Sequence, residues 1–197
     1  MSIIDYMPNL RYPCRHEILT DIKTRLDLMI SWYARVFVVR LDVRFPDQYP
    51  HNGKNTDLSE LMKRLMEYYK YHGVKCTYAG VREQESSEVP HHHMILFFDG
   101  SKLDNGWSVM EHASYLWDRI LGVSCRGCIH LCQTAEGASG LTIRRPRSQS
   151  EGLQLEQEVA SFKAAYNATI EWSSYLAKIR SKGNAPKHVR ERHSSQL

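Results

Sequence analysis

Residues 91–98, His91-His92-His93-Met94-Ile95-Leu96-Phe97-Phe98, combine a histidine cluster with an apolar run directly after Pro90. Alternate residues of a β-strand point to the same face, so His91 and His93 can reach one metal ion while the apolar run anchors the strand in a sheet. Imidazole is a common ligand of transition metals. The stretch therefore predicts a buried strand that opens with a metal-binding pair. A histidine cluster that only hydrogen-bonds at a strand end is the alternative.

An earlier segment, residues 36–45, predicts a second strand. It is rich in β-branched residues and ends at Pro46, and its odd positions are apolar. Its even positions include Arg40, Asp42 and Arg44. We expect one face of this strand to lie in the core and the other to be charged and exposed to solvent.

The remaining segments alternate between helical and extended patterns. Apolar spacing predicts helices over residues 17–35, from 57 to Gly73, and from 108 to Gly122. The second of these begins with Asp57 and Glu60, and the third with Ser108 and Glu111, and both pairs fit a capping box. Further strands are expected at 74–85 and 126–133, and a long helix at about 155–182.

The order of these elements, without the first and last helices, is β-α-β-β-α-β. That order is typical of the split βαβ, ferredoxin-like fold, an α+β arrangement with a four-stranded antiparallel sheet and two helices on one face. The other face stays open or is covered by the added N-terminal helix and the long C-terminal helix. Residues 36–45 and the histidine strand are then central neighbours, which sets the charged face beside His91 and His93.

The length of 197 residues suits one domain, and 42% hydrophobic residues suffice for a core. We expect a core at about 31–133, a flexible loop at about 134–152, the long helix, and a basic tail at 183–197. No run approaches the roughly 20 apolar residues of a membrane helix. The first 25 residues are too charged for a signal-peptide core, so a cytoplasmic location is expected.

Positive charge is concentrated toward the end of the chain. The net charge is +4, yet residues from Lys178 onward hold six Lys or Arg against one acid, and Arg144-Arg145-Pro146-Arg147 adds three more positive charges. Such clusters favour a polyanionic partner with phosphates. A solvated basic tail is the alternative.

The five cysteines include the motif Cys125-x-x-Cys128-x-His130-x-Cys132. A strand would separate Cys128, His130 and Cys132 by about 6.5 Å along one face. The ligands of one zinc ion lie closer together, each about 2.0–2.3 Å from the metal. We therefore expect structural, reduced cysteines in place of a zinc site.

Tyr175-Leu176-Ala177-Lys178 lies near the end of the last predicted helix, where Tyr175 and Lys178 would share a face. A tyrosine phenol has a pKa of about 10, so a nucleophilic tyrosine needs a cation or metal nearby. Lys178 would supply positive charge. The same four-residue pattern also occurs on helices by chance.

Together these motifs resemble the HUH endonucleases, which initiate rolling-circle replication. The strand pattern Pro-His-x-His followed by apolar residues and Phe-Phe, with a later Tyr-Leu-Ala-Lys helix, is most similar to the initiators of filamentous phages (inoviruses). The resemblance covers about residues 31–190.

The resemblance implies a metal site that holds Mg²⁺ or Mn²⁺. Its ligands would be His91, His93 and an acid from a neighbouring strand, for which we choose Glu83, with Glu85 and Asp42 as alternatives. Family members usually have a bulky apolar residue between the two histidines, whereas this chain has His92. The family pattern selects residues 91 and 93 as the pair.

The resemblance also implies the reaction. Tyr175 would be the nucleophile and Lys178 the assisting lysine, nicking single-stranded or hairpin DNA at an origin to give a 5′-phosphotyrosine link and a free 3′-hydroxyl. Candidate phosphate contacts are Arg40, Arg44, Arg144, Arg145, Arg147 and the basic tail. The chain has no G-x-x-x-x-G-K-[ST] motif, so a host helicase and polymerase would be further partners.

Three other functions are compatible with parts of the sequence. One is a non-catalytic ferredoxin-like nucleic-acid-binding module that resembles an RRM, although the expected strands lack its aromatic motif. Another is a relaxase or single-tyrosine transposase with the same chemistry. The third is a structural protein whose histidines bind stray metal.

Overall fold

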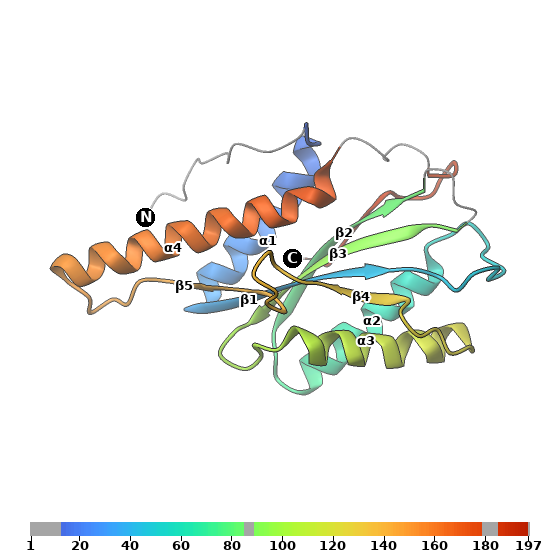
Figure 1. The fold of residues 1–197 in the computed structure, drawn as a ribbon, viewed down its shortest axis with the longest axis horizontal. Helices are drawn as coiled ribbons and strands as arrows, with labels where there is room; N and C mark the ends of the chain where they lie inside the picture. The colour runs from blue at the N-terminus through green and yellow to red at the C-terminus, as the bar shows by residue number, and fades with distance from the viewer. Residues whose placement is uncertain (1–12, 85–88, 179–184, 197) are drawn as a thin grey trace.

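Strands β1 (Arg35–Val43) and β3 (His91–Asp99) form the centre of one antiparallel sheet. The computed structural model describes residues 13–84, 89–178 and 185–196. Strand β4 (Ile129–Cys132) pairs with the far side of β1, and β2 (Cys76–Glu83) with the far side of β3. The resulting order β4-β1-β3-β2 is antiparallel throughout, which confirms the predicted α+β, ferredoxin-like core (Figure 1).

Helices cover both faces of this sheet (Figure 1). Helices α2 (Thr56–Tyr71) and α3 (Gly106–Leu121) pack on one face, and α1 (His16–Trp32) and α4 (Gly152–Ser173) on the other. The second face, for which the sequence left two possibilities, is therefore covered by the added helices. In the described ranges, no helix combines the length and apolar character that crossing a membrane requires.

Two hydrophobic cores result, one on each side of the sheet. The odd positions of β1, such as Val39 and Leu41, lie in the core beneath α2 and α3. Val36 and Val38 point the other way and are fully buried in the core beneath α1 and α4. The expectation of one wholly solvated face on this strand is therefore wrong for its first half, because α1 and α4 cover it.

The predicted flexible loop at 134–152 contains a strand, β5 (Leu141–Arg144). It pairs with the first half of β1, Arg35–Val38, on the same edge that β4 occupies further along. A Cβ atom at Gly140 would lie 2.5 Å from the Val38 carbonyl oxygen, so glycine permits this close approach. A four-residue strand is too short to show a clear alternation in the sequence.

The last predicted helix, 155–182, ends earlier than expected. Helix α4 stops at Ser173 and continues as a 3₁₀ turn, η1 (Ser174–Ala177). The hydroxyl of Ser173 donates to Thr169 O at 2.5 Å, and that of Ser174 donates to Glu171 O at 2.6 Å. Such serine bonds to the backbone weaken a helix and favour its ending. Lys178 follows η1. The last residues of the predicted helix, 179–182, lie outside the described residues.

The basic tail also contains regular structure. Strand β6 (Arg192–Ser194) pairs with β2 and extends the sheet to six strands. The two predicted capping boxes are not used, since Asn55 and Asn105 occupy the N-cap positions of α2 and α3. Gly122 ends α3 with φ 69°, as the sequence predicted.

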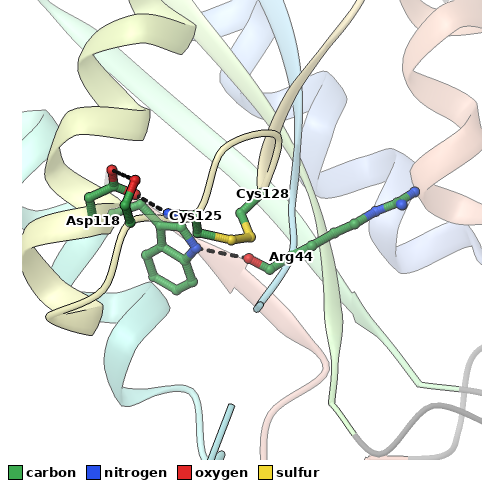
Figure 2. The surroundings of a disulfide bond; sticks show 6 residues. Arg44, Asp118, Cys125 and Cys128 are labelled. Atoms are coloured by element: carbon green, nitrogen blue, oxygen red, sulfur yellow. Dashed lines mark hydrogen bonds between the residues drawn. A yellow bond between two sulfur atoms is a disulfide. The ribbon is translucent and has the colours of Figure 1, made fainter. Parts of the chain in front are cut away.

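The cysteines differ from expectation at one pair. Cys125 and Cys128 are joined by a disulfide between α3 and β4, so the prediction of reduced thiols is wrong for these two residues (Figure 2).

Two histidines from different strands meet on the α2/α3 side of the sheet. The ring centroids of His92 and His193 lie 5.3 Å apart. Burial, followed by the charges of Arg82 and Arg190, lowers the pKa of His193 to about 4. Burial also holds the pKa of His92 well below its usual value. Both rings are therefore neutral at pH 7.

Replacing His193 with Gln should make the protein less sensitive to acid. The pKa of His193 is about 4 in the folded chain and about 6.5 when unfolded. Because the unfolded state binds the extra proton, stability present above pH 6.5 is lost as the pH falls toward 4. Between pH 7 and 4.5 we expect wild type to lose about 2–3 kcal/mol more unfolding free energy than His193→Gln.

Urea unfolding at the two pH values measures this difference. Equal losses in wild type and variant would show that the buried ring of His193 does not titrate with folding. His16→Gln is the control, since His16 is an exposed histidine at the start of α1 and lies away from the buried pair.

Candidate active site

The strand register brings together candidate side chains from three strands. Asp42 on β1 lies opposite His93 on β3, and Glu83 on β2 lies opposite His91. Ile95, two residues after His93, is part of the core beneath α1 and α4. Because alternate residues share a face, His91 and His93 point to this same side of the sheet.

The His93 imidazole lies between two carboxylates. Its Nδ1 is 2.6 Å from Asp42 Oδ1, and its Nε2 is 3.0 Å from Glu83 Oε2. The ring is buried, with 6% of the residue exposed. A histidine held at both nitrogens has a fixed orientation, which a ligand or a proton-transfer group needs.

The carboxylate of Asp42 is ionised at neutral pH. Burial acts to raise its pKa, but the hydrogen bond and charge of His93 oppose this, helped by Cys132 and Arg40, and the net pKa is lowered. A carboxylate on the far nitrogen of a histidine is a common support for a metal ligand. Asp42 therefore suits this supporting role better than that of third ligand.

His91 is partly buried at the start of β3. Burial lowers its pKa first, and the charges of Arg44 and His93 lower it further against the opposing effect of Asp42. The ring is therefore neutral at pH 7, which is the form that binds metal ions.

His92 points to the opposite side of the sheet. It is fully buried in the α2/α3 layer, where its ring lies 6.4 Å from that of Phe45 and contacts His193. The three consecutive histidines thus divide between the two faces, with residues 91 and 93 on the face that carries the acids.

The donor types at this site fit a divalent ion. Two imidazoles and a carboxylate, from His91, His93 and Glu83, are ligands that manganese accepts readily and magnesium less readily. Among the described residues, no three His, Cys, Asp or Glu side chains form a ready-made metal cluster. The Glu83 carboxylate contacts Nε2 of His93 directly, so an ion held by both groups would have to replace this direct contact. Glu85, the other acid considered, lies outside the described residues.

Tyr175 reaches this cluster from the C-terminal part of the chain. It lies on η1 with 37% of its surface exposed, and its ring centroid is 5.3 Å from that of His93, nearly perpendicular to it. Nζ of Lys178 lies 5.8 Å from the centre of the tyrosine ring. Tyr175 and Lys178 are therefore neighbours, as expected, but a 3₁₀ turn brings them together and not one face of an α-helix. Tyr166, in contrast, is buried and donates to Asp27 Oδ1 at 2.7 Å.

Arg40 links the tyrosine to the sheet. Its guanidinium lies 5.0 Å from the ring centre of Tyr175 and 5.3 Å from that of Trp172. It also donates to Trp172 O at 2.9 Å, near the end of α4, where helix carbonyls lack intrahelical partners. Sequence reasoning predicted Arg40 only as a phosphate contact and missed this link, which depends on how α4 crosses β1.

Cys132 is a second neighbour that the sequence did not assign to the site. It lies opposite Arg40 in the β1/β4 register. Burial, and then the charge of the nearby Asp42, raise the pKa of its thiol to about 12, so the thiol is neutral at pH 7. The alternation of residues 126–133 gave the only signal, by placing Cys132 on a β-strand.

The five predicted DNA-binding arginines separate into two groups. Arg40 on β1 and the exposed Arg44, directly after β1, lie beside the cluster. Arg144 pairs with Arg35 at the other end of β1, seven residues from Asp42 or about 23 Å along the strand. Arg145 is exposed next to it, and Arg147 is held by Glu158 at 2.7 Å. The arginine cluster at 144–147 is therefore remote from the tyrosine.

Comparison with known proteins places the chain in a family. Among solved structures, the catalytic domain of the Adeno Associated Virus type 5 Rep protein is similar, with a TM-score of 0.39 and 11% identity over 71% of this chain and 97% of that chain. Similarity at this level carries no argument about chemistry. No curated protein matches the chain by sequence. Residues 7–190 match the YagK/YfjJ C-terminal domain, and the chain belongs to this family.

Proposed function

We propose that this protein is a replication initiator that nicks single-stranded DNA at an origin by attack of Tyr175. One observation carries the proposal: an exposed tyrosine from the C-terminal part of the chain lies against a buried histidine that is bracketed by two carboxylates. A structural tyrosine has no need of such surroundings. Perturbed and paired ionisable groups beside an accessible nucleophile are typical of catalytic sites.

In the proposed reaction, Oη of Tyr175 attacks the phosphorus of the scissile phosphodiester. The new Oη–P bond forms as the P–O3′ bond breaks. Oη gives up its proton to solvent, and the leaving 3′-oxygen takes one up. The products are a 5′-phosphotyrosine and a free 3′-hydroxyl that a polymerase can extend. The reverse attack by a 3′-hydroxyl rejoins the strand, because the bond energy is kept in the covalent link.

The surrounding residues have distinct roles in this mechanism. Arg40 and Lys178 place positive charge around the tyrosine, where negative charge develops on the phosphate. Asp42 keeps His93 oriented. A Mg²⁺ or Mn²⁺ ion held by His91, His93 and Glu83 would supply further positive charge for a non-bridging phosphate oxygen when bound.

DNA is the proposed partner, with a host helicase to open the duplex and a host polymerase to extend the 3′-hydroxyl. Arg44 is exposed at the mouth of the site and suits a phosphate contact. The arginines at 144–147 would contact DNA only well away from the scissile phosphate.

The arrangement of the sheet favours catalysis over simple binding. An RRM-like module stacks bases on exposed aromatic side chains of its central strands. Here α1 and α4 cover the corresponding face of the sheet around the first half of β1. Around the second half of β1 the same face carries Arg40, Asp42 and His93. A relaxase or transposase would use the same chemistry, and no described feature favours either of them over an initiator.

Replacing Tyr175 with Phe should abolish covalent attachment to DNA. We expect labelled single-stranded origin DNA and Mn²⁺ to give a protein–DNA adduct on a denaturing gel, and the variant to lower its rate at least about a thousandfold because the nucleophile is gone. Tyr115→Phe, at an exposed tyrosine of α3, should keep the adduct. No adduct from wild type with any hairpin of its replicon would refute the nicking function.

Metal binding is testable without DNA. Manganese at about 100 times its Kd should stabilise wild type by about 2.7 kcal/mol, because only the folded state assembles the ligands. His91→Ala should remove most of this stabilisation, whereas His72→Ala, at an exposed histidine directly after α2, should not. Calorimetric titration provides the affinity directly. If manganese stabilised wild type and both variants equally, the metal would bind elsewhere.

Replacing Arg40 should slow attack more than it weakens DNA binding. Without Arg40, the contacts to Trp172 O and to the Tyr175 ring are lost, so η1 is held less firmly. A nucleophile that is misplaced by about 1 Å reacts roughly a hundredfold more slowly. We expect Arg40→Met to lower the single-turnover adduct rate by about this factor, Arg40→Lys to restore part of it, and the DNA Kd to change less than about threefold. A loss confined to the Kd would make Arg40 a phosphate contact only.

A further inference from the structure

The disulfide of Cys125 and Cys128 lies in the turn that connects α3 to β4, close to the main chain of Arg44 (Figure 2). Nothing in the proposed nicking reaction uses it. Cys76 and Cys132, by comparison, are not in disulfides. The pair therefore requires an explanation of its own.

The two sulfurs differ in accessibility. Cys125 is partly exposed, whereas Cys128 is 6% exposed at the edge of the α2/α3 core. A C-x-x-C pair with one accessible and one buried sulfur suits stepwise thiol–disulfide exchange, because the outer sulfur meets the reagent and the inner one resolves the intermediate.

The turn is held in place by hydrogen bonds other than the disulfide. The backbone N–H of Cys125 donates to Asp118 Oδ1 at 2.9 Å, and the Ser124 hydroxyl donates to Asp118 Oδ2 at 3.3 Å. The N–H of Cys128 donates to Cys125 O at 3.1 Å. Gly127 adopts φ 85°, a conformation that favours glycine, and completes the turn. These bonds do not depend on the S–S bond, so the reduced thiols would stay close enough to re-form it.

The turn is also connected to the candidate active site. The N–H of Arg44 donates to Cys128 O at 2.8 Å, and the Trp117 indole N–H donates to Arg44 O at 2.8 Å (Figure 2). Both polar groups of the Arg44 main chain are thus held by residues next to the disulfide. The exposed side chain of Arg44 extends away from the disulfide, and its charge acts on His91.

We propose that Cys125 and Cys128 are a reversible redox site, which low-molecular-weight disulfides oxidise and low-molecular-weight thiols reduce, and whose state sets how firmly Arg44 is held beside His91. Oxidation tightens the turn and fixes the Cys128 carbonyl that accepts from Arg44. Reduction leaves the turn formed but gives this end of β1 more freedom.

The exchange balances in two steps. The Cys125 thiolate attacks one sulfur of the small disulfide, forming a mixed disulfide and releasing one small thiol. The Cys128 thiolate then attacks the Cys125 sulfur, forming the protein disulfide and releasing the second small thiol. The protein dithiol loses two electrons and two protons, and the small disulfide gains them as two thiols. Two small thiols reverse the sequence.

The buried Cys76 and the partly buried Cys132 provide internal controls. Burial raises the pKa of Cys76 to about 12, and burial with the charge of Asp42 raises that of Cys132 to a similar value. Thiols of this kind stay protonated near neutral pH and react slowly. Changes in redox state should therefore be confined to the 125–128 pair.

The first test is thiol alkylation of the full chain after equilibration in mixtures of reduced and oxidised glutathione, read by peptide mass spectrometry. We expect residues 125 and 128 to change together from alkylated to disulfide-linked as the mixture becomes more oxidising. Cys125→Ser should leave Cys128 without the intramolecular partner, and Cys132→Ser should leave the transition unchanged. Independent alkylation of the two residues in every mixture, or a disulfide that no thiol reduces, would overturn the proposal.

The second test measures hydrogen exchange at the Arg44 amide, without DNA or metal. We expect exchange at least about tenfold faster in the dithiol form than in the disulfide form, while the central Ile95 amide is unchanged. The Cys125→Ser/Cys128→Ser protein should exchange at the dithiol rate under all redox conditions. Equal Arg44 rates in both redox states would refute the coupling, and neither test depends on whether the chain nicks DNA.

Discussion

The pairing of β1 with β3 is the constraint on which the remaining structure depends. Side chains of β3 alternate between two hydrophobic cores, with Leu96 in one and Ile95 in the other. A slip of one residue would exchange the two faces and set His92 where His93 now lies. Since both faces are filled and covered by helices, the register that places His93 opposite Asp42 is fixed by packing on both sides of the sheet.

This packing makes a buried group of charges tolerable. Removing charges from water is unfavourable unless they find partners, and an unpaired charge in such a place destabilises strongly. Asp42 and Glu83 share His93, and Arg40 adds a positive charge that contacts both an aromatic ring and a helix carbonyl. The polar cluster therefore holds its members in mutual orientation. It lies past the apolar half of β1, where the ring of Tyr175 packs against His93.

Long periodic segments explain how much could be predicted. The alternation over residues 36–45 and the run from His91 to Phe98 gave the two central strands, and the order of the elements gave their adjacency. The family resemblance, and not the apolar run, selected His91 and His93 as the pair. Helical periodicity gave all four long helices. Their ends shifted by up to three residues, except that α4 ends at Ser173, well before the predicted residue 182. Each signal is long enough for its pattern to be distinguished from chance.

What the sequence missed depends on contacts between distant segments. Strand β5 is four residues long and forms only because β1 offers an unpaired edge there. The bond from Arg40 to Trp172 O requires α4 to cross a particular strand, and no local pattern encodes that crossing. The same holds for Cys132 beside Asp42. The bond between Cys125 and Cys128 depends on the geometry of one turn, which spacing alone leaves undecided.

The position of Tyr175 after α4 has a consequence for the order in which the molecule is assembled. Synthesis runs from the N-terminus, so the strands that carry Asp42, Glu83 and His93 leave the ribosome well before the tyrosine does. Helix α4 can dock only on a sheet and an α1 helix that already exist. A nascent chain would thus have the polar cluster but no tyrosine beside it. In the proposed reaction, the end of folding is the step that brings the nucleophile to the cluster, so an unfinished copy would not attach to DNA.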